Sequence, residues 1–378
     1  MSKDNRVSLS DRFKSVNKAS KNNMITMMLV LVFFIVFNVM INSTGSESLI
    51  GVFPMICYYI ILAISLNLVV GILGELSLGH AGFMCVGAFS SGVFSLMYAE
   101  AIPNLYVRFF LAVIVGTIFG AIFGAFIGSA VLRLRGDYLA VVTLAFGEVI
   151  KTLIGNLYLV YDNGALKASF ITNTVTQNLS EDGIVLIKGA QGLDKLMRSY
   201  REFHKEDTFI LLGMILVFIA VVIVLNFINS RSGRAVMSIR DNRIAAEATG
   251  INITKYRLMI YVLSSALAGM AGALYIHVLG SAEPLAFDYN LSIEILVIVV
   301  LGGIGSTRGA FIAAIILTWL PKSTLFMGLD KYRMLIYSIV LIVMMIFTWN
   351  PTCKELIQKL SIKRLFKKKA KGAEVTEE

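Results

Sequence analysis

The sequence predicts an all-α membrane protein, a polytopic transmembrane helical bundle of about ten spans. Of its 378 residues, 57% are hydrophobic and 15% are charged, and the mean hydropathy is +0.78. A soluble domain typically carries roughly 25% charged residues. The apolar runs are also long: a helix needs roughly 20 residues to cross the hydrocarbon core, whereas strands of an outer-membrane barrel alternate over about ten residues. These observations favour helices.

Ten apolar runs qualify as spans, and two of them have alternative interpretations. The run 24–41 is too long for a typical signal-peptide core, but the small residues after it leave a cleaved signal peptide as the alternative. The run 290–304 is short, so a re-entrant segment is its alternative. The ten expected spans are 24–41, 50–70, 80–98, 107–132, 138–160, 208–229, 256–278, 290–304, 309–326 and 333–349.

The distribution of Lys and Arg predicts that both termini are cytoplasmic. Basic residues near membrane spans collect on the cytoplasmic side. Residues 1–23 contain six Lys and Arg and residues 350–378 contain eight, while the segments 42–49 and 99–106 contain none. We therefore expect two cytosolic basic tails flanking a transmembrane domain over 24–349. The net charge of +10 reflects this topology and attraction to anionic lipid headgroups, so no nucleic-acid partner is expected.

The segment 161–207 falls on the outer side in this topology and is the sizeable polar stretch there. It mixes acidic and basic residues, among them Lys167, Asp182 and Lys188. Such a loop either receives a soluble partner or is a solvated connector between spans, and both interpretations are open.

The polar segment 230–255 falls on the cytoplasmic side and is predicted to form a short helix outside the membrane. Its candidate caps are Ser230 or Ser232 at the start, Gly250 at the end, and Asn252 or Thr254 at the start of the next helix. One polar edge carries Arg240, Arg243 and Glu247 at three- and four-residue spacing, and another face carries Ala235, Ile239 and Ala246. The helix either rests on anionic headgroups or docks on a partner protein.

Glycines interrupt the run 67–89 and surround several polar residues. Inside a bilayer, broken backbone is tolerated where it faces protein or a water-filled cavity. This segment is therefore a candidate for a translocation pathway, and close helix packing by small residues is the alternative. The candidate pathway residues are Glu75, Ser77, Gly79 and His80.

Glu148 is a carboxylate inside a predicted span. Asp137 is expected to cap this helix, and Glu148 follows eleven residues later, about 16 Å deep at about 1.5 Å per residue and near the bilayer midplane. A carboxylate at that depth must be paired, hydrated or protonated. Lys151, three residues further on, can pair with it. A structural ion pair and a pathway role are both open.

Other glycine patterns predict architecture. Glycine recurs every fourth residue from Gly116 to Gly128, so a neighbouring backbone is expected to approach this helix face closely. The glycine-rich run 300–309 lacks the spacing of a phosphate-binding loop, and no Walker A, GxSxG or HExxH motif occurs in the sequence. The cysteines and histidines lack metal-ligand spacing. No catalytic, cofactor-binding or metal-binding residue is therefore expected.

Four segments, in the same order, resemble the LivM-type permease family of branched-chain amino acid transporters. They are 67–89 with Ser-Leu-Gly-His, 133–151 with Gly-Asp-Tyr-Leu, 233–251 with Ile-Arg-Asp-Asn, and 300–309 with Gly-Gly-Ile-Gly-Ser. Glu75 stands where the family has glutamine. The resemblance also weakens in 188–193 and 348–351, so contacts with an external binding protein are the part that transfers least.

The resemblance implies the transmembrane subunit of an ATP-driven ABC importer that carries branched-chain amino acids across the bacterial plasma membrane by alternating access. The implied partners are a second, LivH-like permease subunit, two cytoplasmic ATPase subunits and an extracytoplasmic solute-binding protein. The segment 230–255 is then the coupling segment. Its expected ATPase contacts are Arg240, Asp241, Arg243, Ala246, Glu247 and Gly250, and the expected pathway comprises Glu75, Ser77, Gly79, His80 and Glu148.

Three other functions remain as alternatives. Urea or short-amide uptake belongs to the same kind of permease. A self-sufficient proton-coupled carrier would use Glu75 and Glu148 as proton-carrying groups, and a membrane-embedded enzyme would assemble dispersed polar residues. The substrate itself is not fixed by this sequence, because selectivity in such importers is expected to lie in the binding protein.

Overall fold

A computed structural model describes residues 18–44, 47–131, 136–162, 165–170, 183–194 and 208–319, with six isolated positions: Leu196, Tyr200, Phe203, Leu335, Ile339 and Ile342. The chain divides into two compact units, Met1–Ser323 and Thr324–Glu378, and the named helices and strands all belong to the first. The last expected span and the C-terminal tail lie outside the described ranges, as does most of the N-terminal tail.

Seven helices of the described part are long and apolar enough to cross a bilayer, and they coincide with the first seven expected spans. They are α2 (Lys18–Thr44), α3 (Glu47–Asn67) with its continuation η1 (Leu68–Leu73), α4 (His80–Met97), α5 (Leu105–Val131), α6 (Asp137–Gly155), α10 (Thr208–Asn229) and α13 (Ile253–Leu279). The helix α6 begins after Gly136, which has a positive φ of 59°, rather than behind an Asp137 cap.

Two shorter apolar helices follow, α14 (Tyr289–Gly302) and α15 (Thr307–Trp319). At about 1.5 Å per residue, α14 is about 21 Å long, shorter than the hydrocarbon core of about 30 Å. The expected run 290–304 is therefore a helix shorter than a full span.

The prediction of an all-α fold missed a small sheet that follows α6. The expected span 138–160 ends at Gly155, and three antiparallel strands follow in the order β2-β1-β3. They are β1 (Leu157–Asp162), β2 (Ala165–Phe170) and β3 (Ile184–Lys188). Leu-Tyr-Leu-Val-Tyr combines aromatic and β-branched residues that favour a strand, but its hydrophobicity continued the helical pattern. Lys167 pairs with the buried Asp162 across β1 and β2 at 2.6 Å.

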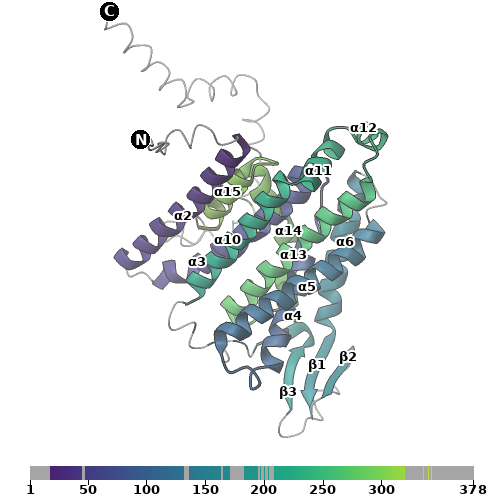
Figure 1. The fold of residues 1–378 in the computed structure, drawn as a ribbon. Coiled ribbons are helices and arrows are strands. Elements are labelled where there is room, and N and C mark those ends of the chain that lie inside the picture. Colours follow the sequence, from purple (N-terminus) through teal and green to yellow (C-terminus); the bar gives the residue numbers. More distant parts are fainter. Residues whose placement is uncertain are drawn as a thin grey trace, which may run out of the picture. The chain divides into compact units, whose positions relative to one another are not determined.

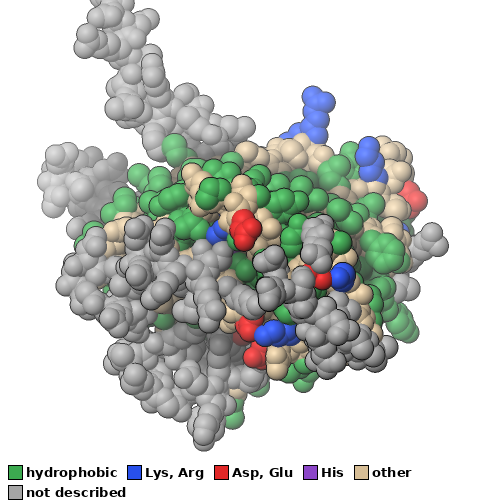
Figure 2. All heavy atoms as spheres, turned by 90° about the horizontal axis from the view of Figure 1, so that it is seen from below, with side chains coloured by type: hydrophobic (Ala, Val, Ile, Leu, Met, Phe, Trp, Pro, Cys, Tyr) green, Lys and Arg blue, Asp and Glu red, His purple; other side chains and the backbone are tan. Residues whose placement is uncertain are grey.

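The outer segment is also fastened to the helices. Leu193 and Ala282 exchange two backbone hydrogen bonds of 3.0 and 2.9 Å. Tyr200 is fully buried, with the Arg108 guanidinium 4.9 Å from its ring centre and His277 against its edge. These contacts do not agree with the interpretation of segment 161–207 as a freely solvated connector. Seen from the end that carries the sheet, acidic and basic side chains lie near one another among hydrophobic ones (Figure 2).

Large apolar side chains cover the outside of the bundle. On α2, Met28 and Ile35 are 66% and 63% exposed, and on α5 Phe126 is 69% exposed. A soluble protein rarely leaves such side chains in contiguous patches, whereas a bilayer requires them. These faces therefore contact lipid or other membrane subunits.

The core of the unit is the packing of α13 against α4 and α5, which lie side by side in Figure 1. Glycines let the backbones approach, as the α5 pattern predicted. A Cβ added at Gly87 would lie 2.2 Å from the Gly269 carbonyl oxygen, and one added at Gly120 would lie 2.6 Å from the Ser265 carbonyl oxygen. These helices pack through backbone contacts that have no room for a side chain.

Replacing Gly87 by alanine is therefore expected to destabilise the protein by about 1–3 kcal/mol through overpacking. The measurement is thermal unfolding of the detergent-solubilised protein, with a drop in Tm of several degrees. Gly51→Ala on α3 is the matched control, because nothing lies within 4 Å of its added Cβ. Equal Tm changes in the two variants would show that the close packing at Gly87 does not determine the stability of the protein.

Candidate functional site

The predicted interruption between the second and third spans is present. The helix α3 passes into a π-helical stretch, η1, in which all six residues are buried. Gly74 follows in the left-handed conformation with φ 80°, residues 75–79 are not helical, and α4 begins at His80. π-helical turns are frequent at functional sites. This break gives residues 74–79, here called the interrupted segment, a backbone that can be repositioned.

His80 fastens the start of α4 to α3. Its Nε2 lies 2.7 Å from Ser65 Oγ, and the Ser65 hydroxyl donates to the Leu62 carbonyl at 2.8 Å. Because that hydroxyl has one proton, the bond between the two side chains has His80 Nε2–H as donor. The side chain is buried, so His80 anchors the C-terminal end of the interrupted segment.

The second half of the interrupted segment packs tightly on α6. The Leu78 N–H donates to Thr143 Oγ1 at 3.0 Å. A Cβ at Gly79 would lie 2.3 Å from the Thr143 carbonyl oxygen, so a side chain does not fit there. Ser77 is also buried. Four of the predicted pathway residues therefore lie in one short stretch of chain, whose last residues are held by α3 and α6. They are Glu75, Ser77, Gly79 and His80.

Glu75 forms an ion pair that the sequence did not reveal. Its Oε1 lies 2.6 Å from Nε of Arg257, in the second turn of α13, and the two side chains are 22% and 3% exposed respectively. The detectable signal was Arg257 itself, because a cation inside the expected span 256–278 requires a partner. The identity of that partner depends on tertiary structure.

Glu148 pairs with Lys151, as their spacing predicted. Its Oε1 also accepts the Tyr289 N–H at 2.9 Å, at the first residue of α14. Next to it, Asp288 caps the same helix by accepting the Leu291 N–H at 3.1 Å. Carboxylates are stabilised at a helix N-terminus. Glu148 thus connects α6 to α14. Within the residues that the structure describes, its carboxylate makes no hydrogen bond to the other predicted pathway residues.

The coupling segment contains two helices, α11 (Arg231–Asp241) and α12 (Arg243–Ala248), so the prediction of one short helix is wrong. The break is at Asn242, which has an extended backbone and accepts the Ala245 N–H on its side chain at 3.0 Å. Asparagine favours such caps over helix interiors. The expected caps at Ser230 and Asn252 are confirmed, and Gly250 has φ 84° as expected.

The break separates residues that a continuous helix would have aligned. Arg240 turns toward the protein, where its Nη1 donates to the Gly71 carbonyl at 3.0 Å, while its Nη2 pairs with Asp241 at 3.0 Å. Its aliphatic part covers Gly74, where an added Cβ would be 2.7 Å from Arg240 Cγ. The expected polar edge of Arg240, Arg243 and Glu247 is therefore divided.

Arg240, Gly71, Asn67 and Gly305 form what we call the coupling node. The Gly305 N–H donates to Asn67 Oδ1 at 2.9 Å, and a Cβ at Gly71 would be 2.4 Å from the Gly305 nitrogen. The node thus joins the coupling segment, η1 and the turn between α14 and α15. The close approach of Gly305 to Gly71 explains why the run 300–309 is rich in glycine.

The outward face of the coupling segment contains an apolar side chain that the sequence analysis did not select. Ile244, on α12, is 82% exposed. Around it Asp241, Glu247 and Gly250 are exposed, whereas Ala246 is buried against the protein. The signal was an isoleucine directly beside the charged Arg243 in the sequence. α11 and α12 lie at the opposite end of the unit from the sheet (Figure 1).

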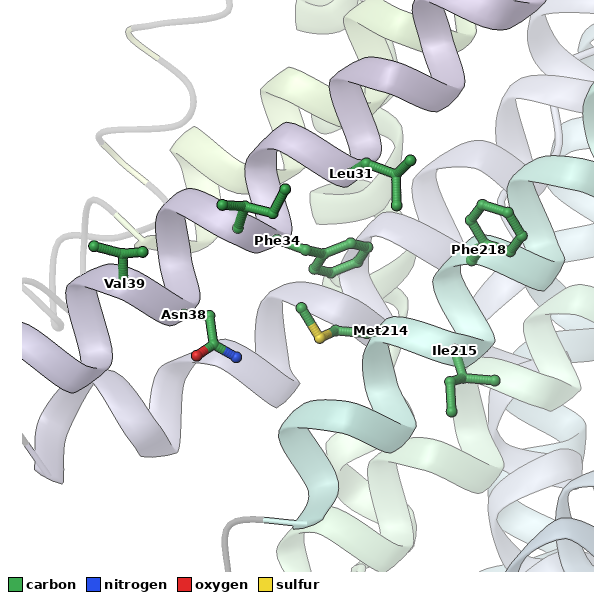
Figure 3. Close-up of a pocket in the computed structure, with 8 residues that line it drawn as sticks. Leu31, Phe34, Asn38, Val39, Met214, Ile215 and Phe218 are labelled. Carbon is green, nitrogen blue, oxygen red and sulfur yellow. The ribbon is translucent and has the colours of Figure 1, made fainter.

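Two apolar pockets lie away from these residues. One, of about 530 Å³, lies between α2 and α10 and contains Asn38 among side chains such as Leu31, Phe34 and Phe218 (Figure 3). The other, of about 490 Å³, lies between α4, α5, α6 and the sheet and is apolar except for Ser90. Neither lining contains a charged side chain, so neither offers ionic partners for an amino acid's ammonium and carboxylate groups.

The structure is an apolar helical bundle in which a polar segment is hydrogen-bonded to an interrupted helix, and this arrangement points to a membrane transport subunit. Residues 48–347 match the family model described as branched-chain amino acid transport system / permease component, and the chain belongs to that family. It is therefore an integral membrane protein and a transport subunit, not an enzyme, and acts with other subunits.

Similar proteins agree with this assignment. The high-affinity branched-chain amino acid transport system permease protein LivM of Salmonella typhimurium strain LT2 is 29% identical over 311 residues, which cover 81% of this chain and 69% of that protein. LivM of Escherichia coli K12 has the same identity and coverage. The ribose import permease RbsC of E. coli K12 is 30% identical over 128 residues, 32% of this chain and 40% of that protein. No solved structure matches.

Proposed function

We propose that this chain is the transmembrane subunit of an ATP-driven importer that carries leucine, isoleucine and valine into a bacterium across the plasma membrane. The similarity to LivM over 81% of the chain supports this substrate class. The observation that carries the ATP-driven mechanism is the hydrogen bond from Arg240 in the coupling segment to the Gly71 carbonyl in η1. This hydrogen bond connects the coupling segment directly to the helix that precedes the interrupted segment.

In this proposal the chain has about ten spans with both termini in the cytoplasm. A second, LivH-like permease subunit completes the membrane part, and two ATPase subunits contact the outward face of α12. An extracytoplasmic solute-binding protein delivers the amino acid to the end that carries the sheet. The ion pairs of the sheet region, Lys167 with Asp162 and Lys188 with Asp194, support a folded docking platform at that end.

Alternating access follows from the way the coupling segment is attached. When the ATPases close on ATP, they displace α11 and α12 together, because the two helices meet at the single residue Asn242. Arg240 then carries the displacement to Gly71, and the interrupted segment changes its position between α3 and α6. Coupling of this kind requires a bistable packed element, and a π-helical stretch followed by non-helical backbone supplies one.

A proton-coupled carrier receives less support. Such a carrier needs a carboxylate that binds and releases protons during the cycle, whereas Glu75 pairs with Arg257 and Glu148 pairs with Lys151. Urea or short-amide import remains the competing substrate class.

The test is uptake by the complete complex in liposomes, with ATP inside and the cognate binding protein outside. We expect ATP-dependent accumulation of radiolabelled leucine, isoleucine and valine, and no accumulation of urea. The chain alone, under a proton gradient, is the control and is expected to be inactive. Urea uptake by the complex would replace the substrate assignment, and proton-driven uptake by the chain alone would refute the ATP-driven mechanism.

A further inference from the structure

We propose that Arg257 is a positioning residue of the transport cycle, and that its ion pair with Glu75 is a clamp that holds the interrupted segment against α13 until the coupling segment moves. This inference rests on the proposed ATP-driven function and adds to it a second mechanical link, distinct from Arg240.

The burial of the pair makes it a strong tether. Arg257 Nε and Glu75 Oε1 are 2.6 Å apart, and the arginine side chain is 3% exposed. Separating two such charges inside a protein is far more unfavourable than separating a pair at the surface. The clamp is therefore expected to hold whenever nothing pulls on α13.

The chain connects Arg257 rigidly to the coupling segment. The turn after α12 is fixed by the Ile251 N–H, which donates to the Ala246 carbonyl at 3.1 Å. Asn252 then caps α13 by accepting the Lys255 N–H at 3.0 Å, and Arg257 follows in the second turn. A displacement of α12 therefore moves the start of α13, and with it the arginine.

The interrupted segment is held differently at its two ends. Leu78 and Gly79 are packed on Thr143 of α6, whereas Glu75 is held by α13 and Gly74 lies under Arg240. Both links to the coupling segment thus act on the first half, while the second half stays anchored. Pulling on α11 and the start of α13 would bend the segment between these two attachments.

The pair is also incomplete. Glu75 Oε2 is buried and makes no hydrogen bond within the described residues. A carboxylate bound through one oxygen holds an arginine less firmly than the bidentate arrangement of which both groups are capable. The geometry thus combines a desolvated tether with an unsatisfied oxygen, as expected of a contact that opens and closes.

The experiment compares Arg257→Gln, Glu75→Gln and the charge-swapped double variant Glu75→Arg/Arg257→Glu in the reconstituted complex. The readout is the amount of leucine imported per ATP hydrolysed, which a purely structural role would not change in correctly assembled complexes. We expect about a tenfold lower ratio for Arg257→Gln, and a partial return toward the wild-type ratio in the charge swap, because the swap restores the attraction. Glu75→Gln preserves shape and tests the charge alone if Arg257→Gln does not assemble.

Lys188→Gln is the matched control, because it breaks the exposed pair with Asp194 and is expected to leave the ratio unchanged. A wild-type ratio in both single-glutamine variants would overturn the clamp, and so would a charge swap no better than Arg257→Gln. Failure of the wild-type complex to import leucine with ATP would instead refute the proposed function, so the two failures are distinguishable.

Discussion

Replacement of Ile244 by aspartate is expected to prevent the chain from co-purifying with its ATPase subunits and to abolish ATP-dependent uptake. The isoleucine is 82% exposed on α12, with the exposed Asp241 and Glu247 near it in the sequence. An isolated apolar anchor surrounded by polar residues is typical of a binding hot spot, where truncation alone weakens association by about 2 kcal/mol or more, roughly 30-fold. A carboxylate adds the unfavourable burial of a charge in the partner's pocket.

Leu285→Asp is the matched control for this prediction. Leu285 is also strongly exposed, at 66%, but it lies in the turn η3 (Pro284–Phe287) before α14, beyond the outer end of α13. That variant is expected to retain the ATPases. Quantitative pull-down with tagged ATPase measures both. If Ile244→Asp recovered as much ATPase as the wild-type chain does, α12 would not be part of the interface with the ATPases.

Replacement of Arg240 by alanine is expected to separate ATP hydrolysis from transport. The ATPases should still bind, because their expected contact is the outward face of α12, whereas Arg240 lies on α11 and donates to the Gly71 carbonyl. A hydrogen bond from a charged group contributes about 1.5–3 kcal/mol, so its loss at the coupling node should lower leucine uptake about tenfold or more while ATP hydrolysis continues. Parallel assays of hydrolysis and uptake in the same proteoliposomes measure the effect.

Arg234→Ala provides the comparison on the same helix. Arg234 is exposed and donates at 2.9 Å to the Asn229 carbonyl at the end of α10, away from the coupling node. Its removal is expected to leave the ratio of uptake to hydrolysis unchanged. If Arg240→Ala behaves like Arg234→Ala, force does not pass through Gly71.

Local patterns in the sequence predicted the parts of the fold that depend on local chemistry. Ser230 and Asn252 cap helices because the short side chain of each accepts the free N–H three residues later, of Gly233 and Lys255 respectively. The glycines of α5 mark a close helix contact for an equally local reason, since only one face of that helix lacks side chains. The pairing of Glu148 with Lys151 follows from their spacing on one helix.

The parts that the sequence did not predict depend on distant residues or on competing local preferences. Arg257 and Glu75 lie on different spans, so their pairing requires the packing of α13 beside the interrupted segment. The strand β1 was hidden because its residues are as apolar as the helix before it. The break at Asn242 was missed because the regular spacing of Arg240, Arg243 and Glu247 favoured a continuous helix. Helical periodicity alone cannot exclude a break.

The π-helical geometry of η1 has a consequence for how small a displacement can matter. A π turn accommodates one more residue than an α turn does. If η1 relaxed to α geometry by releasing a single residue, the residues directly after it, Gly74 and Glu75, would rotate by about 100° and advance by about 1.5 Å relative to α3. Glu75 would then leave the face of α13, although no backbone segment had to melt. A shift of one residue in the hydrogen-bond register of η1 is thus enough to move Glu75 away from α13.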